Sequence, residues 1–174
     1  MDRFCAFLRG VNVNGTSMKM VDVVDVFQKS GMKDVVSVLA TGNIIFSSDK
    51  ESTELKSILE RKIGTHFNYE CFLFIKKKED ILNIVKENPF ENDVNFHVYY
   101  FVTETGNAKI LMDEFQKCPS SKDEEAYLKQ DHFYWKVKKG NTLDSEFGKI
   151  LGKKNFKSLF TSRNMNTIEK IIKK

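Results

Sequence analysis

The sequence has few of the patterns that would place it in a specialised class. No apolar run approaches the roughly 18 residues needed to span a bilayer, and residues 1–9 are too short and too charged for a signal peptide. Cys5, Cys71 and Cys118 are odd in number, far apart and without metal-ligand spacing. We therefore expect a cytoplasmic protein without a disulfide scaffold, whose cysteines pack as small hydrophobic side chains.

Motifs that identify a reaction are also missing. The sequence contains no His-Glu-x-x-His pair, no nucleophile elbow, no Walker loop and no Gly-x-Gly-x-x-Gly pattern. His66, His97 and His132 have no metal-ligand spacing, and the last two lie in predicted strands. No metal or cofactor is expected. Whether the protein is an enzyme stays open, because no reaction can be named.

The composition is that of a globular protein, but the charge is uneven. The 174 residues are 41% hydrophobic and 30% charged, which suits one or two compact domains. Residues 136–174 carry 11 Lys/Arg and 3 Asp/Glu, whereas residues 1–135 carry 17 and 21. This asymmetry indicates either an anionic partner or a solvated basic face that complements the acidic remainder. We favour the second explanation.

Hydrophobic spacing predicts a ferredoxin-like unit over residues 1–78. Apolar residues alternate between short β-branched runs and runs at helical spacing, and Gly31 follows the first predicted helix as a C-terminal glycine. The resulting order is βαββαβ, the ferredoxin-like plait. The predicted elements are strand 4–9, a helix containing Met20–Phe27, strand 35–40, strand 44–46, a helix containing Leu55–Ile63, and strand 71–75.

Residues 79–174 repeat the alternation and predict a second α/β unit with C-terminal helices. A helix around 81–85 should end near Asn88-Pro89, because the residue before proline avoids the helical region. Asn107 is predicted to cap the next helix, and either Asn164 or Asn166 the last one. The other predicted elements are strand 96–102, the hairpin 125–129 and 132–137, and a helix at 145–151. The overall prediction is an α+β chain of two ferredoxin-like units with mostly antiparallel sheets.

The first predicted strand is apolar on both of its faces. Phe4, Ala6 and Leu8 alternate with Cys5 and Phe7, and the fourth strand has the same character. A sheet wet on one face should instead alternate apolar with polar residues. We therefore expect the first sheet to be covered on both faces.

The most informative segment is the loop that follows the first strand. In a plait this loop and the turn between strands two and three leave the same edge of the sheet, so the two should converge. Glycine, asparagine and arginine at a helix start favour a phosphate or carboxylate. Local architecture is the plainer explanation, and by sequence alone it carries more weight. The predicted ligand-binding residues here are Arg9, Gly10, Asn12, Asn14, Gly15, Lys19, Thr41, Gly42 and Asn43.

A second polar segment, Thr161–Thr167, leads into the last predicted helix. Asn166 and Glu169 have the spacing of a capping box. Arg163 opposes the helix dipole unless an anion lies there, so Arg163 and Asn164 join the predicted site.

Four motifs in order give the chain a family resemblance. These are Leu8–Gly15, Thr41–Phe46, Asn88–Phe90 and Thr161–Ile171. The chain resembles domain-of-unknown-function family 1697, which has Leu-Arg-Gly-Ile-Asn-Val-Gly-Gly, Ser-Gly-Asn-Val-x-Phe, Asn-Pro-Phe and Thr-x-Arg-Asn-Trp-Asn-Thr. The resemblance implies two ferredoxin-like units and no known activity. This chain departs from the family pattern at Asn14, Thr41 and Met165, and Ser145-Glu146-Phe147 lacks a lysine of the family.

Three functions remain open from the sequence. The first is binding of a phosphorylated small molecule or nucleotide at Arg9–Gly15. The second is binding of RNA or single-stranded nucleic acid, which ranks lower because no RNP pattern occurs and the first sheet is expected to be covered. The third is a structural or interaction role, including homo-oligomer formation.

Overall fold

The computed structural model describes residues 1–11 and 17–174, which divide into two compact units. The first unit holds Met1–Leu82 with Glu169–Lys174, and the second holds Asn83–Ile168. The division falls inside helix α3 (Lys78–Glu87) and inside helix α6 (Met165–Ile172). A boundary within a continuous helix leaves no Gly, Pro or polar linker in the sequence. The domain bounds 1–78 and 79–174 stay a prediction.

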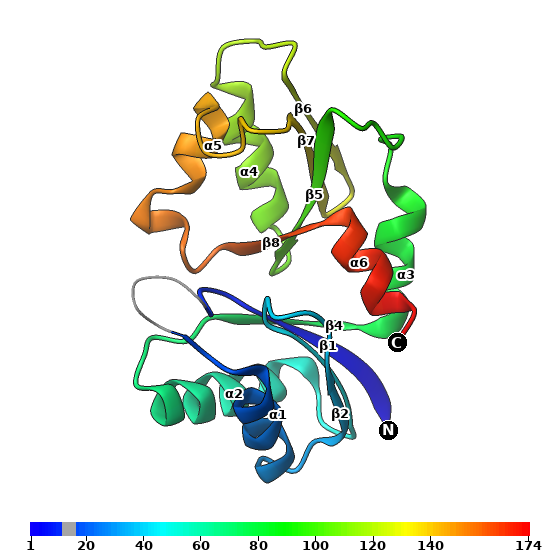
Figure 1. Cartoon of the computed structure of the whole chain (residues 1–174), viewed down its shortest axis with the longest axis vertical. Helices are drawn as coiled ribbons and strands as arrows, with labels where there is room; N and C mark the ends of the chain where they lie inside the picture. Colours follow the sequence, from blue (N-terminus) through cyan, green and yellow to red (C-terminus); the bar gives the residue numbers. More distant parts are fainter. Residues whose placement is uncertain (12–16) are drawn as a thin grey trace. The chain divides into compact units, whose positions relative to one another are not determined.

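The first unit is a four-stranded antiparallel sheet with two helices on one face (Figure 1). Its elements are β1 (Asp2–Leu8), α1 (Met20–Lys29), β2 (Lys33–Ser37), β3 (Asn43–Ser48), α2 (Ser52–Phe67) and β4 (Leu73–Lys77). The strand order β2-β3-β1-β4, here called sheet 1, is that of the ferredoxin-like plait and confirms the predicted fold. The predicted strand 35–40 was placed too late, because Leu39 has a φ of 61° and belongs to the β2–β3 turn.

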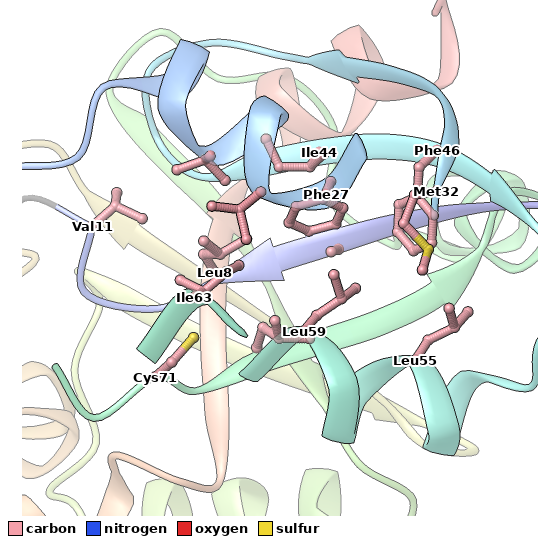
Figure 2. Close-up of a cluster of buried hydrophobic side chains, with 14 of the residues drawn as sticks. Leu8, Val11, Phe27, Met32, Ile44, Phe46, Leu55, Leu59, Ile63 and Cys71 are labelled. Carbon is pink, nitrogen blue, oxygen red and sulfur yellow. The ribbon is translucent and has the colours of Figure 1, made fainter. Parts of the chain in front are cut away.

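Apolar side chains between sheet 1 and its two helices form the core of the first unit. Figure 2 shows Leu8 of β1 and Ile44 and Phe46 of β3 in one cluster with Phe27 of α1 and Leu59 of α2. All five side chains are at most 1% exposed. At roughly 1.5–3 kcal/mol for each fully buried side chain, this layer is a main source of stability for the unit.

The opposite face of sheet 1 is buried as well. Cys5 and Phe7 of β1, Ile45 of β3 and Phe74 of β4 point away from the helices, because they alternate with the core residues, and each is at most 1% exposed. The prediction that this sheet is covered on both faces is confirmed. Its aromatic side chains are therefore unavailable for stacking on bases.

The second unit repeats the plait. Sheet 2 has the antiparallel order β6-β7-β5-β8, and the strands and helices again follow βαββαβ. The residues 83–87 of α3 precede β5 (Phe96–Thr103), α4 (Asn107–Gln116), β6 (Glu124–Lys129), β7 (His132–Lys138), α5 (Glu146–Leu151), the 3₁₀ turn Lys154–Phe156, β8 (Phe160–Asn164) and α6.

An aromatic cluster forms the core between sheet 2 and its helices. Phe101 of β5 and Trp135 of β7 pack against Phe147 of α5, with their ring centroids 6.3 and 5.4 Å from the Phe147 ring centroid. Phe115 of α4 meets the same ring edge-on at 5.2 Å. Phe147 is fully buried and therefore anchors the short helix α5 to the sheet.

Of the predicted helix caps, Asn107 is wrong, whereas Asn164, one of the two alternatives for the last helix, is confirmed. Gly106, with a φ of 90°, is the N-cap of α4, while the Asn107 side chain donates to the Leu159 carbonyl at 3.5 Å. At α6 the Asn166 N–H donates to Asn164 Oδ1 at 3.0 Å. Asn166 thus lies inside the helix, and the predicted capping box with Glu169 is wrong, because Asn164 supplies the cap.

Candidate functional site

The loop after β1 and the β2–β3 turn converge, as the plait topology predicts. The Leu8 N–H donates to the Gly42 carbonyl at 2.8 Å, and Phe7 pairs with Asn43 in the sheet register. On the other side, the Arg9 N–H donates to the Phe72 carbonyl at 2.9 Å, because β4 begins at the same edge. Three backbone segments therefore meet at Leu8 and Arg9.

Two glycines in this region have backbone conformations that other residues rarely adopt. Gly10 has a φ of 73° and Gly42 a φ of 77°. A Cβ added to Gly42 would lie 2.8 Å from Val11 Cγ1 and 3.0 Å from Leu8 Cβ. Gly42 is thus required both for its left-handed conformation and for the close approach of the turn to β1.

Asn43 has an architectural role in the turn. Its side chain is fully buried, and its Nδ2 donates to the Val38 carbonyl and to Thr41 Oγ1, both at 2.9 Å. The Val38 N–H donates to the Asn43 carbonyl at 2.8 Å, which closes the same turn. The Thr-Gly-Asn motif is therefore explained in large part by turn geometry, while Thr41 lies on the surface.

Arg9 and Lys19 are the cationic residues of the predicted site. Arg9 is half-buried at the end of β1, and this burial lowers the pKa of its guanidinium group from the usual value. Lys19 is exposed and is the N-cap residue of α1, where its side chain makes no cap hydrogen bond and its carbonyl accepts from the Asp22 N–H at 3.0 Å. The predicted residues Asn12, Asn14 and Gly15 lie outside the described residues.

The remaining predicted residues, Arg163 and Asn164, belong to the second unit. Arg163 is in β8, where it is 8% exposed and donates to Thr161 Oγ1 at 2.7 Å and to the Ser162 carbonyl at 2.9 Å. Asn164 caps α6 and contacts His97 Nδ1 through its Nδ2 at 3.2 Å. Arg163 therefore lies in strand β8 and also two residues before the first residue of α6, next to the cap residue Asn164.

Sequence reasoning missed a polar clamp at the start of β4. Glu60 of α2 accepts from the Leu73 N–H at 3.0 Å and from Lys56 at 2.8 Å, and Lys56 also donates to the Leu73 carbonyl. Tyr69 donates to Cys71 Sγ at 3.1 Å. Burial raises the pKa of the Cys71 thiol to about 11, so this cysteine is a neutral packing residue at physiological pH. The i, i+4 spacing of Lys56 and Glu60 was the available signal.

Other features of the described residues do not add a site for an anion. A hollow of about 280 Å³ in the second unit is lined by Asp123, Glu124, Asp144 and Glu146, which would repel one. Within residues 1–11 and 17–174 no cluster of His, Cys, Asp and Glu could hold a metal ion. Over the same ranges, none of the helices is long and apolar enough to cross a membrane.

Comparisons with known proteins agree with this fold. The profile of the family described as protein of unknown function (DUF1697) matches residues 1–134. The chain is also similar to the solved structure of a conserved bacterial protein from Streptococcus pneumoniae, with a TM-score of 0.82 and 22% identity over 99% of this chain and 97% of that one. A comparison with curated proteins found no match. At 22% identity the structural likeness shows the shared fold alone.

Proposed function

The chain belongs to domain-of-unknown-function family 1697, and from the residues at the end of β1 we propose that it binds a phosphorylated small molecule or a nucleotide beside Arg9. The family description assigns no activity, so the proposal rests on this chain. The observation that carries it is a half-buried arginine at the point where three backbone segments meet.

Partial burial of Arg9 favours an anionic ligand. Removing a cation from water is costly, and burial is the cause of the lowered guanidinium pKa. Arginine remains charged in spite of such a shift, because its usual pKa is far above neutral pH. Its planar group can donate two parallel hydrogen bonds to a phosphate or carboxylate.

The surroundings of Arg9 support a phosphate more than a single carboxylate. Gly10 and Gly42 have positive φ, which lets successive backbone N–H groups turn towards one side of the chain. Lys19, the exposed N-cap residue of α1, supplies a second positive charge. Several donors and two cations match the charge and the number of oxygen atoms of a phosphate group.

RNA and protein partners rank below a phosphorylated small molecule. Bases would need exposed aromatic rings, and those on the second face of sheet 1, such as Phe7 and Phe74, are at most 1% exposed. Homo-oligomer formation and an interaction role stay predictions.

Thermal unfolding tests the proposal directly. The native chain would be screened against inorganic phosphate, sugar phosphates, nucleotides and short RNAs. A ligand at about 100 times its dissociation constant should stabilise the protein by roughly 2.7 kcal/mol. We expect one phosphorylated class to raise the unfolding temperature of the native chain and to have no effect on Arg9→Ala.

Arg3→Ala is the matched control. Arg3 is half-buried near the other end of β1, where it donates to Ser47 Oγ at 3.2 Å. It should keep the stabilisation by ligand. The proposal is wrong if no phosphorylated compound stabilises the native chain, or if Arg9→Ala responds as the native chain does. Stabilisation by RNA that falls steeply with salt would favour the nucleic-acid alternative instead.

A further inference from the structure

A cluster of titratable side chains lies on the face of sheet 2 that α4 and α5 do not cover. His132 begins β7, and its Nδ1 is 3.2 Å from the hydroxyl of Tyr100 on β5. Tyr134, two residues further along β7, donates to the Ile84 carbonyl of α3 at 2.7 Å. Residues 83–87 of α3 therefore pack on this face within the second unit.

Glu87, the last residue of α3, belongs to the same cluster, and its surroundings are unfavourable for a carboxylate. Its Oε2 is buried and, among the described residues, has no hydrogen-bond partner. A carboxylate at a helix C-terminus is also opposed by the negative end of the helix dipole. Both effects are relieved when a cation or an additional donor approaches this oxygen atom.

His132 is placed to supply that charge. Its Nε2 is 3.9 Å from Glu87 Oε2, which is too long for a hydrogen bond but within the range of an ion pair, and both side chains are 21% exposed. If the Tyr100 hydroxyl donates to Nδ1, the neutral imidazole carries its proton on Nε2, which faces Glu87. Protonation then places the second proton on Nδ1 and leaves the N–H that faces Glu87 in place.

We propose that His132 and Glu87 form a pH-sensitive latch, in which protonation of the imidazole fastens the C-terminal turn of α3 to sheet 2. The latch is weak at neutral pH, where the imidazole is mostly uncharged. It strengthens as the pH falls through the ordinary imidazole range near 6.5, because an ion pair replaces a neutral contact.

Other charged and titratable groups around His132 set the strength of the latch. Glu87 faces the imidazole from α3, Tyr100 faces it from β5, and Asp131 precedes it in the β6–β7 turn. From β6, Lys129 lies with its Nζ 3.7 Å from Glu87 Oε1 and competes for the same carboxylate. The lysine side chain is 47% exposed, so water screens its repulsion of the imidazolium.

A double-mutant cycle of Glu87→Gln and His132→Gln tests the latch. Urea unfolding would be followed at about pH 8 and about pH 5.5 by the fluorescence of Trp135, the single tryptophan, which is buried in sheet 2. The difference in coupling between the two pH values cancels the titration of all other groups. We expect coupling that changes the unfolding equilibrium constant about two- to fivefold at the lower pH and vanishes at the higher. Equal coupling at both pH values, or none at either, overturns the proposal.

A second measurement applies even if His132→Gln does not fold. The chain has three histidines, so their ring signals can be followed by NMR as a function of pH in the native chain and in Glu87→Gln. The midpoint for His132 should fall by about half a pH unit in the variant. The exposed His66 of α2 is the internal control and should not move. An unchanged His132 midpoint would refute the latch.

Discussion

Gly42→Ala should be among the most destabilising single-methyl changes in the first unit. The left-handed conformation of Gly42, with a φ of 77°, costs an L-residue roughly 1–2 kcal/mol. The added Cβ would also lie 3.0 Å from Leu8 Cβ and 2.8 Å from Val11 Cγ1, and overpacking of this kind costs about 1–3 kcal/mol. The expected loss is therefore about 2–5 kcal/mol, a large fraction of the stability of an ordinary domain.

Gly31→Ala separates the two contributions. Gly31 ends α1 with a φ of 88° and has no atom within 4 Å of an added Cβ, so its replacement carries the backbone cost alone. Urea unfolding of both variants, followed by far-ultraviolet circular dichroism, should give Gly42→Ala the lower midpoint, with a difference of about 1–3 kcal/mol in the free energy of unfolding. Equal midpoints would show that an added Cβ at Gly42 does not clash with Leu8 and Val11, which would contradict the close approach of the β2–β3 turn to β1.

Two further predictions concern the β2–β3 turn and the cysteines. Asn43→Ala should lower the free energy of unfolding by about 1–3 kcal/mol, because the buried Val38 carbonyl loses a donor. Thr41→Val should lower it less, because Thr41 is exposed. Urea titration of both variants checks this order. Iodoacetamide at about pH 8.5 should modify Cys118 before Cys71, since Cys71 is buried with a thiol pKa of about 11. Peptide mass mapping gives the order of modification. Faster modification of Cys71 would contradict its assignment as a packing residue.

The sequence predicts the plait because apolar spacing and turn chemistry agree along most of the chain. Gly31 illustrates this agreement: its N–H donates to the Gln28 carbonyl and the following Met32 N–H to the Phe27 carbonyl, the bonds of a Schellman C-cap. Strand β8 was missed for the opposite reason. Its residues Thr161–Asn164 are polar and form a strand only through pairing with β5, a contact between distant segments that local patterns do not contain.

The candidate site was predictable only as far as topology reaches. The convergence of Leu8 with Gly42 follows from the strand order, and the structure confirms it. The sequence does not show which of these residues hold the turn and which bind a ligand, because its pattern places Gly42, Asn43 and Arg9 in one predicted site. Contacts show that the first two hold the turn in place. The His132–Glu87 contact could not be predicted from local sequence patterns, since it joins residues 45 positions apart on different elements.

Stability measured without ligand can therefore decide between architecture and binding at Arg9. Residues kept for binding are commonly neutral or costly to stability, whereas residues kept for packing stabilise the fold. If Arg9 serves a ligand and not the framework, Arg9→Ala should change the free energy of unfolding by less than about 0.5 kcal/mol. Urea titration in phosphate-free buffer, with Gly42→Ala as the architectural reference, makes the measurement. A loss as large as that of Gly42→Ala would make Arg9 part of the framework, and the anion would have to be sought elsewhere.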